Sequence, residues 1–562
     1  MVEGTEPTAG TRSRRKPARG RHAAARPVAA QRGLLRSSAL MAVGTVVSRA
    51  TGLIRQVLQA GALGTGLLAT TYNEANAVPA SLYFLLIGGA LNSVLVPQLV
   101  RARIEQPDGG RAFEQRLVTL TMSVLGAGTL LAVWAAPRIV GLYQTDSPEN
   151  HAAFRLTVVF ARFLLPQVFF YGLFSILGQV LNARNKFGAM MWTPVLNNVV
   201  LVAVFGGYVG MMTAPDRVQD ITRTQVTLLG VGTTLALAVQ ALALIPFVRA
   251  AGFRFRPRFD WRGTGLRRSI GAARWTLLFV ATNLAAGTVV TRYASAADKA
   301  LPRGGVGFSA YTYAQTIWML PQSVVTVSLV TVLLPRMSRA VAENRPDDMR
   351  KDLSHTLRTS GVVIVPAAFF FLALGPQVAQ LLFAHGAADS ASTRPLGYML
   401  QAFGPGLIPF SAQYVLLRGF YAFDDTRTPW LAAVWIGAVD VVLATGCHLL
   451  MPARWAVTGM AAAYALSYGV GLLVTARLLR RHLAGRIDGR RLLGTYGRLM
   501  LAALVAGACG WLVADRCSTA LASPTGAAAL ALVAGGAAML VLFLLLARAL
   551  RISELGVLPG LR

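Results

Sequence analysis

The chain has 562 residues, of which 54% are hydrophobic and only 14% charged, with a mean hydropathy of +0.53 and a formal net charge of +31. A soluble protein of this length cannot bury so much apolar surface in one or two cores, so composition excludes an ordinary soluble enzyme. Apolar runs of about 20 residues or more are long enough to cross a bilayer and are continuous rather than alternating. They predict an all-α polytopic membrane protein.

The first 36 residues are polar and basic, with nine Lys and Arg residues. This composition predicts a disordered tail that lies on the cytoplasmic side and touches anionic lipid, while a partner-binding arm is the alternative. The first apolar run is too long for a secretory signal and leads directly into others.

Fourteen apolar segments follow the tail. The predicted spans are 38–59, 72–100, 117–136, 155–182, 191–210, 225–248, 269–291, 307–334, 359–383, 396–417, 429–450, 456–476, 499–515 and 525–547. Of the 54 Lys and Arg residues, 41 fall in the two tails and the loops after even-numbered spans, ten fall in the other loops, and three lie inside spans. This bias predicts a multi-pass protein of the bacterial plasma (inner) membrane with both termini in the cytoplasm. It also accounts for the net charge without nucleic-acid binding, since the basic residues are scattered over many loops.

The first span carries two arginines, Arg49 near its middle and Arg55 in its outer third. Ser48 shares a helical face with Arg55, and Arg49 lies about 100° away around the helix. Guanidinium groups suit phosphate geometry, so the three residues predict a site for an anionic substrate. Snorkelling to the interface is the alternative for Arg55, but Arg49 is too deep for it.

The second span opens with a polar stretch that includes Asn73 and Glu74. Glu74 is predicted to pair with Arg55 at the outer mouth of a cavity, and both polar residues are candidate substrate ligands. The alternative is that the stretch only caps the helix in the headgroup region.

A pattern in the second span returns in the eighth. Each copy has a mid-helix proline (Pro79, Pro321), then Val-Leu-x-Pro (Pro97, Pro335), and then a basic residue at the end of the span. The even offset of six spans makes the copies run in the same direction, which predicts two six-helix lobes around a central cavity. The predicted division is a tail at 1–36, lobes at 37–250 and 251–480, and two further helices with the C-terminal tail at 481–562.

Asp440 is an ionisable residue well inside the eleventh span. It is a candidate for ion coupling, with Asn283 of the seventh span as a possible partner, and structural pairing is the alternative.

The sequence contains no HExxH, GxSxG or P-loop motif, which argues against an enzyme. The three cysteines have no metal-ligand spacing, and no cofactor or metal site is expected.

Several segments together resemble the MurJ (MviN) lipid II flippases of the MOP exporter superfamily. They are ALMAVGTVVSRATGLIRQ (Ala39–Gln56), GGALNSVLVPQLVRA in the second span, GQVLNARNKFGAMMWTPVLNN (Gly178–Asn198) and RGFYAFDDTRTPW (Arg418–Trp430). The resemblance implies a fourteen-helix fold with a cationic cavity between two lobes. It implies transport of the undecaprenyl-pyrophosphate-linked peptidoglycan precursor, lipid II, from the inner to the outer leaflet by alternating access. Membrane lipids, cell-wall synthesis proteins and coupling to Na⁺ or the membrane potential are expected with it.

The family's two helix-one arginines fall on Arg49 and Arg55, but three other positions depart from its pattern. Thr70 stands where an acidic residue is usual, and Tyr83 and Thr316 stand where many members have arginine. Glu74, one turn after Thr70, is predicted to replace the lost carboxylate. These departures keep two alternatives open: a transporter of another polyprenyl-linked glycan, and a scaffold for cell-wall synthesis that does not transport.

Overall fold

The computed structural model describes residues 27–88, 99, 102, 106–184, 186, 188–215, 217–260, 266–483 and 488–557. Every regular element in these ranges is helical, and they contain no β-strand. This confirms the predicted all-α membrane class. The physical reason is that a helix satisfies its own backbone hydrogen bonds where lipid offers none.

The elements fall into three consecutive sets. The first comprises α1 (Pro27–Leu63), α2 (Leu67–Tyr83), η1 (Phe84–Gly88), α4 (Arg111–Trp134), α5 (Ala136–Val140), α6 (His151–Leu164), α7 (Gln167–Asn182), α8 (Gly188–Met211), η3 (Val218–Asp220), α9 (Arg223–Leu242) and α10 (Leu244–Ala250). The second comprises α11 (Leu266–Ala300), α12 (Phe308–Trp318), η4 (Gln322–Thr326), α13 (Val327–Ala342), α14 (Pro346–Phe383), α15 (Ser390–Phe403), η5 (Gly404–Gly406), α16 (Leu407–Ala422), α17 (Arg427–Leu450) and α18 (Ala453–His482). The third comprises α19 (Gly489–Ser518), α20 (Pro524–Ala549) and η6 (Ser553–Val557).

Eleven helical segments of the described chain are long and apolar enough to cross a membrane. The predicted spans at 38–59, 72–100 and 396–417 are not among them. Two of these are interrupted: α2 changes into the π-helical turn η1, and a short 3-10 turn separates α15 from α16. The count of fourteen therefore stays a prediction.

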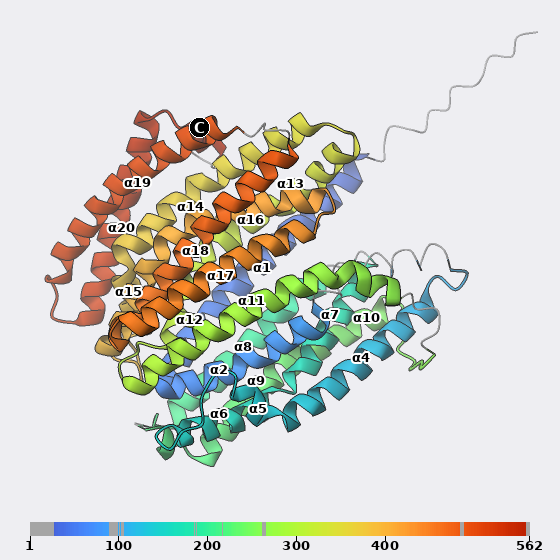
Figure 1. The fold of residues 1–562 in the computed structure, drawn as a ribbon, viewed down its shortest axis with the longest axis horizontal. Helices are drawn as coiled ribbons and strands as arrows, with labels where there is room; N and C mark the ends of the chain where they lie inside the picture. The colour runs from blue at the N-terminus through green and yellow to red at the C-terminus, as the bar shows by residue number, and fades with distance from the viewer. Residues whose placement is uncertain are drawn as a thin grey trace, which may run out of the picture.

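The helices form two bundles (Figure 1), one with α2 and α4–α10 and the other with α13–α20. Helices α1, α11 and α12 run along the boundary between the bundles. Of these, α1 packs mainly against α8 of the first lobe, and α11 packs mainly against α17 of the second. Each lobe therefore contributes a long helix to the interface.

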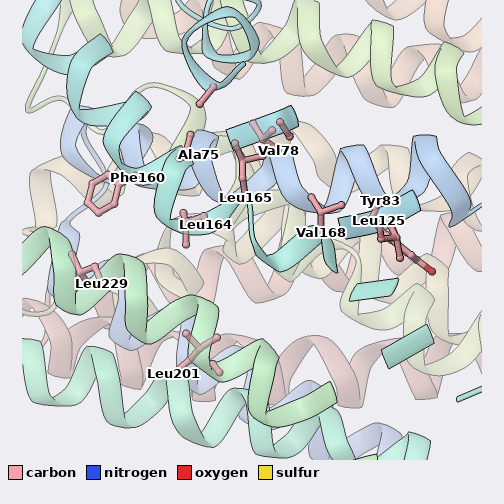
Figure 2. Packing of buried hydrophobic residues seen from close by; sticks show 14 of the residues in the cluster. Ala75, Val78, Tyr83, Leu125, Phe160, Leu164, Leu165, Val168, Leu201 and Leu229 are labelled. Atoms are coloured by element: carbon pink, nitrogen blue, oxygen red, sulfur yellow. The ribbon is translucent and has the colours of Figure 1, made fainter. Parts of the chain in front are cut away.

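The core of the first lobe is built from α2 and the helices that surround it. Tyr72 of α2 makes edge-to-face contacts with Phe160 and Phe205, with ring centroids 5.5 and 5.9 Å apart. Figure 2 shows further apolar side chains of this cluster, which come from α2, α6, α7, α8 and α9: Ala75, Val78, Leu164, Val168, Leu201 and Leu229. This packing holds one face of α2 in the first lobe. The other face of α2 is available for contact with the second lobe.

The internal repeat appears in the backbone as two π-helical turns. Element η1 begins at Phe84, 13 residues before Pro97, and η4 begins at Gln322, 13 residues before Pro335. A π-turn inserts an extra residue into the helical ladder and often marks a functional position. The equal spacing shows that the two copies share a local distortion as well as a sequence pattern.

The last two long helices pack closely on each other and on α14. A Cβ atom added to Gly535 would lie 2.7 Å from the carbonyl oxygen of Gly510, whereas one added to Gly536 would meet only the Phe370 ring at 3.6 Å. The backbones of α19 and α20 therefore touch at Gly535, as small residues allow in membrane helix pairs.

We expect Gly535→Ala to lower the free energy of unfolding by about 1–3 kcal/mol, because the added methyl group forces the two backbones apart. Thermal unfolding of the detergent-purified protein measures this effect, with Gly536→Ala as the matched control. Equal melting temperatures for the two variants would show that the contact is not needed.

Candidate substrate site and the seam between the lobes

The rotation of α1 is set by its contact with α8. The Asn198 amide donates to the carbonyl oxygen of Ser48 and to the Thr51 hydroxyl, at 3.0 Å each, beside Gly52. Asn198 is thus an interhelical hydrogen-bond donor, and this contact turns the Ser48–Thr51 face toward α8. Ser48 contributes its backbone carbonyl to this contact, and a role of its hydroxyl in substrate binding stays a prediction.

Arg49 and Arg55 are left without an anionic partner. Neither guanidinium lies within ion-pair distance of a carboxylate among the described residues. Arg49 is exposed, while Arg55 is half-buried and its Nε is buried with no hydrogen-bond partner in the described part of the chain. A buried donor without a partner costs free energy, so an incoming anion would relieve it.

The surroundings of Arg55 are aromatic and hydroxylated. Its charge acts on the hydroxyl groups of Tyr72 of α2, Tyr171 of α7 and Tyr313 of α12. The side chain therefore lies where helices of both lobes approach each other. In this position the Arg55 guanidinium can interact both with a substrate and with the interface between the lobes.

The polar start of α2 is buried against the second lobe. The Thr70 hydroxyl donates to an Asp298 carboxylate oxygen at 2.5 Å and accepts from the Ser309 amide at 3.2 Å. Asn73 donates to the Ser309 hydroxyl at 2.8 Å. Glu74 accepts hydrogen bonds from Ser295 of α11 and from Gln144. We call Thr70, Asn73 and Glu74 of α2 with Ser295, Asp298 and Ser309 of α11 and α12 the interlobe seam.

This arrangement corrects the predicted pairing of Glu74 with Arg55, while replacement of the family's carboxylate by Glu74 stays a prediction. Glu74 forms no ion pair with Arg55; its two carboxylate oxygens are taken by Ser295 and Gln144. The carboxylate that stands beside Thr70 is not Glu74 but Asp298, which comes from the other lobe. Sequence reasoning missed Asp298 because the predicted seventh span ended at residue 291, whereas α11 continues to Ala300.

Backbone contacts close the same end of the molecule. Leu67 N–H donates to Pro302 at 3.0 Å, and Ala387 N–H donates to Gly61 at 2.8 Å. Gly305 has a φ of +59°, and a Cβ there would lie 2.0 Å from the Ser392 carbonyl oxygen, so only glycine fits. The lobes therefore contact each other at the α1–α2 turn, the end of the molecule opposite the N-terminus of α1.

Asp440 lies on α17, 5% exposed, with one carboxylate oxygen that has no hydrogen-bond partner in the described structure. Its charge acts on the hydroxyl groups of Tyr311, Tyr464 and Tyr468. Asn283 on neighbouring α11 is exposed and donates to the carbonyl of Phe279, one turn earlier, at 2.7 Å. No hydrogen bond joins Asn283 to Asp440 in the described structure, and the pairing stays a prediction.

The remaining departures from the family pattern occupy different environments. Tyr83 is buried and stacks on Tyr171 with centroids 5.8 Å apart. Thr316 is exposed, and its hydroxyl donates to the Thr312 carbonyl at 2.9 Å. Tyr83 is therefore packed against its neighbours, while the side chain of Thr316 is exposed.

No group of three or more His, Cys, Asp or Glu residues that could hold a metal ion occurs in the described residues.

Comparisons with known proteins agree with this geometry. The family model described as "Lipid II flippase MurJ" matches residues 59–521. A probable lipid II flippase MurJ of Rhizobium meliloti is 31% identical over 497 residues, covering 86% of this chain and 87% of the relative. The corresponding protein of Haemophilus influenzae is 27% identical and covers 83% and 90%.

Solved structures show the same fold. A lipid II flippase MurJ in an inward closed conformation matches with a TM-score of 0.71 at 19% identity, over 91% of this chain and 99% of that one. An inward-facing MATE-family multidrug transporter of the MOP superfamily matches with a TM-score of 0.59 at 14% identity, over 78% and 94%.

Proposed function

Because this chain belongs to the MurJ family of lipid II flippases, we propose that it moves lipid II from the cytoplasmic to the outer leaflet of the bacterial plasma membrane. Transport proceeds by alternating access of the two lobes and involves no covalent chemistry. The observation that carries the proposal is the pair Arg49 and Arg55 on α1, two guanidinium groups with no carboxylate partner in the described chain.

These two arginines suit the pyrophosphate of a lipid-linked substrate. A guanidinium offers several N–H donors in a planar fork that matches phosphate oxygens, and its attraction is strongest where water is excluded. A drug antiporter of the same fold would instead use carboxylates to attract cations. The substrate's polyprenyl tail stays in the membrane, so only the headgroup needs a polar route.

The charge distribution supports an orientation. The basic tails and loops after even-numbered spans belong in the cytoplasm, which places the α1–α2 turn and the interlobe seam at the outer face. The structure is then closed to the outside, with Arg49 exposed on the cytoplasmic side of the seam. This is the state that accepts substrate from the inner leaflet.

Ion coupling is a separate element of the proposal. The buried carboxylate of Asp440, with an oxygen that has no hydrogen-bond partner in the described structure, supports a coupling role through Na⁺ or the membrane potential. Asn283 donates one hydrogen bond within α11, and its part in ion coupling stays a prediction.

A transporter of another polyprenyl-linked glycan is the second candidate. Tyr83 and Thr316 favour it, because they replace two arginines that the family resemblance led us to expect. Both candidates share the phosphate-binding pair on α1 and differ only in the glycan.

The test is complementation of bacteria depleted of their own lipid II flippase. Outer-leaflet lipid II is measured with an externally added toxin that cleaves it. Growth and toxin-released product show that this chain moves lipid II. If neither growth nor toxin-released product is restored although the protein is inserted normally, the proposal is contradicted. Another polyprenyl-linked glycan is then the substrate to assay.

Within the seam, we expect Glu74→Gln to reduce flipping severalfold. The substitution removes the negative charge and replaces one acceptor oxygen by an NH2 donor, so the charge-assisted hydrogen bonds from Ser295 and Gln144 are not both retained. The toxin assay measures the rate, and Glu149→Gln, outside the seam, is the control. Unchanged activity of Glu74→Gln would show that the seam does not need this carboxylate.

A further inference from the structure

A second basic site lies far from the interlobe seam, where α14, α19 and the C-terminal turn meet. It is a cavity of about 240 Å³. Its lining consists of five arginines, one glutamate and three other residues: Arg358, Arg490, Arg491, Gly494, Thr495, Arg498, Arg551, Ile552 and Glu554. We call it the arginine pocket. Helices α19 and α20 lie at the edge of the second bundle, away from the first (Figure 1), so this pocket is separate from Arg49 and Arg55.

The charges of the pocket are not balanced within the described chain. Arg358 and Glu554 form a buried ion pair at its base. Arg490, Arg491, Arg498 and Arg551 have no carboxylate within ion-pair distance among the described residues. All four arginines line the pocket and are exposed, so an anion bound there would be attracted by several guanidinium groups.

A buried donor points to the same conclusion. Arg358 is only 8% exposed, and its Nε has no hydrogen-bond partner in the described structure although Nη1 binds Glu554. Thr495 adds a hydroxyl to the lining. Phosphate oxygens accept hydrogen bonds from such donors, and guanidinium groups bind them in pairs.

The pocket is held in place by packing rather than by a ligand. The Tyr496 hydroxyl donates to the Leu357 carbonyl at 2.9 Å, which ties α19 to α14 next to Arg358. Beyond α20, Arg551 adopts a left-handed backbone with a φ of +51°, and the chain turns back so that Ile552 and Leu555 are buried in the core. All sides of the pocket are therefore preformed.

The surface next to the pocket is apolar and exposed. One face of α19 carries Arg490, Gly494 and Arg498, which are spaced four residues apart. Leu501 lies on the same face and is 54% exposed. Leu493, beside the pocket, is 77% exposed. A ligand with a phosphate in the pocket would thus have room for an acyl chain along α19.

We propose that the arginine pocket binds the phosphate headgroup of an anionic phospholipid, with its acyl chains lying along α19. The unpaired arginines fit a negative headgroup, and the exposed Leu493 and Leu501 beside the pocket favour a membrane lipid over free phosphate. The bound lipid ties α19 to the C-terminal turn and stabilises the last two helices.

The experiment measures the melting temperature of the purified full-length chain in detergent with added phosphatidylglycerol, phosphatidylcholine or inorganic phosphate. We expect phosphatidylglycerol to raise the melting temperature by several degrees, and the other two additions to have little effect. Equal stabilisation by inorganic phosphate or by phosphatidylcholine would overturn the assignment to an anionic lipid.

Two variants test the location. The triple substitution Arg490→Ala, Arg491→Ala and Arg498→Ala removes charge, and Gly494→Phe fills the pocket without removing charge. A Cβ at Gly494 meets nothing within 4 Å, so the larger side chain begins in open space. Both variants should lose the phosphatidylglycerol effect and keep the wild-type melting temperature in its absence.

The matched control removes three exposed arginines elsewhere, by Arg249→Ala, Arg254→Ala and Arg256→Ala. It should retain the full phosphatidylglycerol effect. If the pocket variants respond to phosphatidylglycerol as the wild type does, the lipid binds elsewhere and the proposal is wrong. This readout does not involve lipid II, so its failure is distinct from failure of the flippase assay.

Discussion

Arg49→Ala is expected to reduce flipping by about 10- to 100-fold while leaving the protein inserted and stable. A hydrogen bond to a charged group contributes about 1.5–3 kcal/mol, and losing it from a site of low dielectric lowers affinity by about 10- to 100-fold. Because Arg49 is exposed and makes no hydrogen bond or ion pair within the described chain, its removal should not affect folding. Arg55→Ala should have a similar effect on flipping, through the other guanidinium of the pair.

The measurement is the toxin assay in depleted cells, with the amount of membrane-inserted protein determined alongside. Arg162→Ala is the matched control, since Arg162 is an exposed arginine of α6 that we interpret as an interfacial anchor. Wild-type lipid II cleavage in the Arg49→Ala variant would contradict a role of the α1 arginines. It would favour the scaffold interpretation if cell growth were rescued without outer-leaflet lipid II.

Cross-linking the interlobe seam is expected to stop transport reversibly. The hydroxyl oxygens of Thr70 and Ser309, on opposite lobes, lie 3.1 Å apart. Cysteines at both positions therefore place two sulfur atoms close enough for a disulfide after a small adjustment. Alternating access requires the lobes to separate at this end, so a covalent bond here holds the protein in its inward-facing state.

The double variant is made in a chain whose native cysteines, all free, are replaced by alanine. Flipping should fall to background after oxidation and return on reduction, while Thr70→Cys and Ser309→Cys alone respond to neither treatment. Full transport by the oxidised, cross-linked protein would show that the seam does not open during the cycle.

The helical class and the internal repeat could be predicted from the sequence, but the partners of the polar residues could not. Asn73 and Glu74 stood out as unusually polar for a membrane span, and both are buried at the interface. Their partners Ser295 and Ser309 lie more than 200 residues further along the chain. Nothing in the local pattern distinguishes contact with these residues from contact with Arg55.

The length and continuity of the apolar runs determine the membrane class, and the distribution of basic residues predicts the topology, because both act locally on insertion into a bilayer. The two arginines of α1 were also identifiable, since a deep charge is costly wherever it occurs. Only the tertiary structure decided that Asp298 supplies the carboxylate beside Thr70 and that the lobes close at the α1–α2 turn. It also decided that arginines from α14, α19 and the C-terminal turn share one pocket. These features depend on how separate helices rotate and pack against one another, and hydrophobic periodicity does not encode that information.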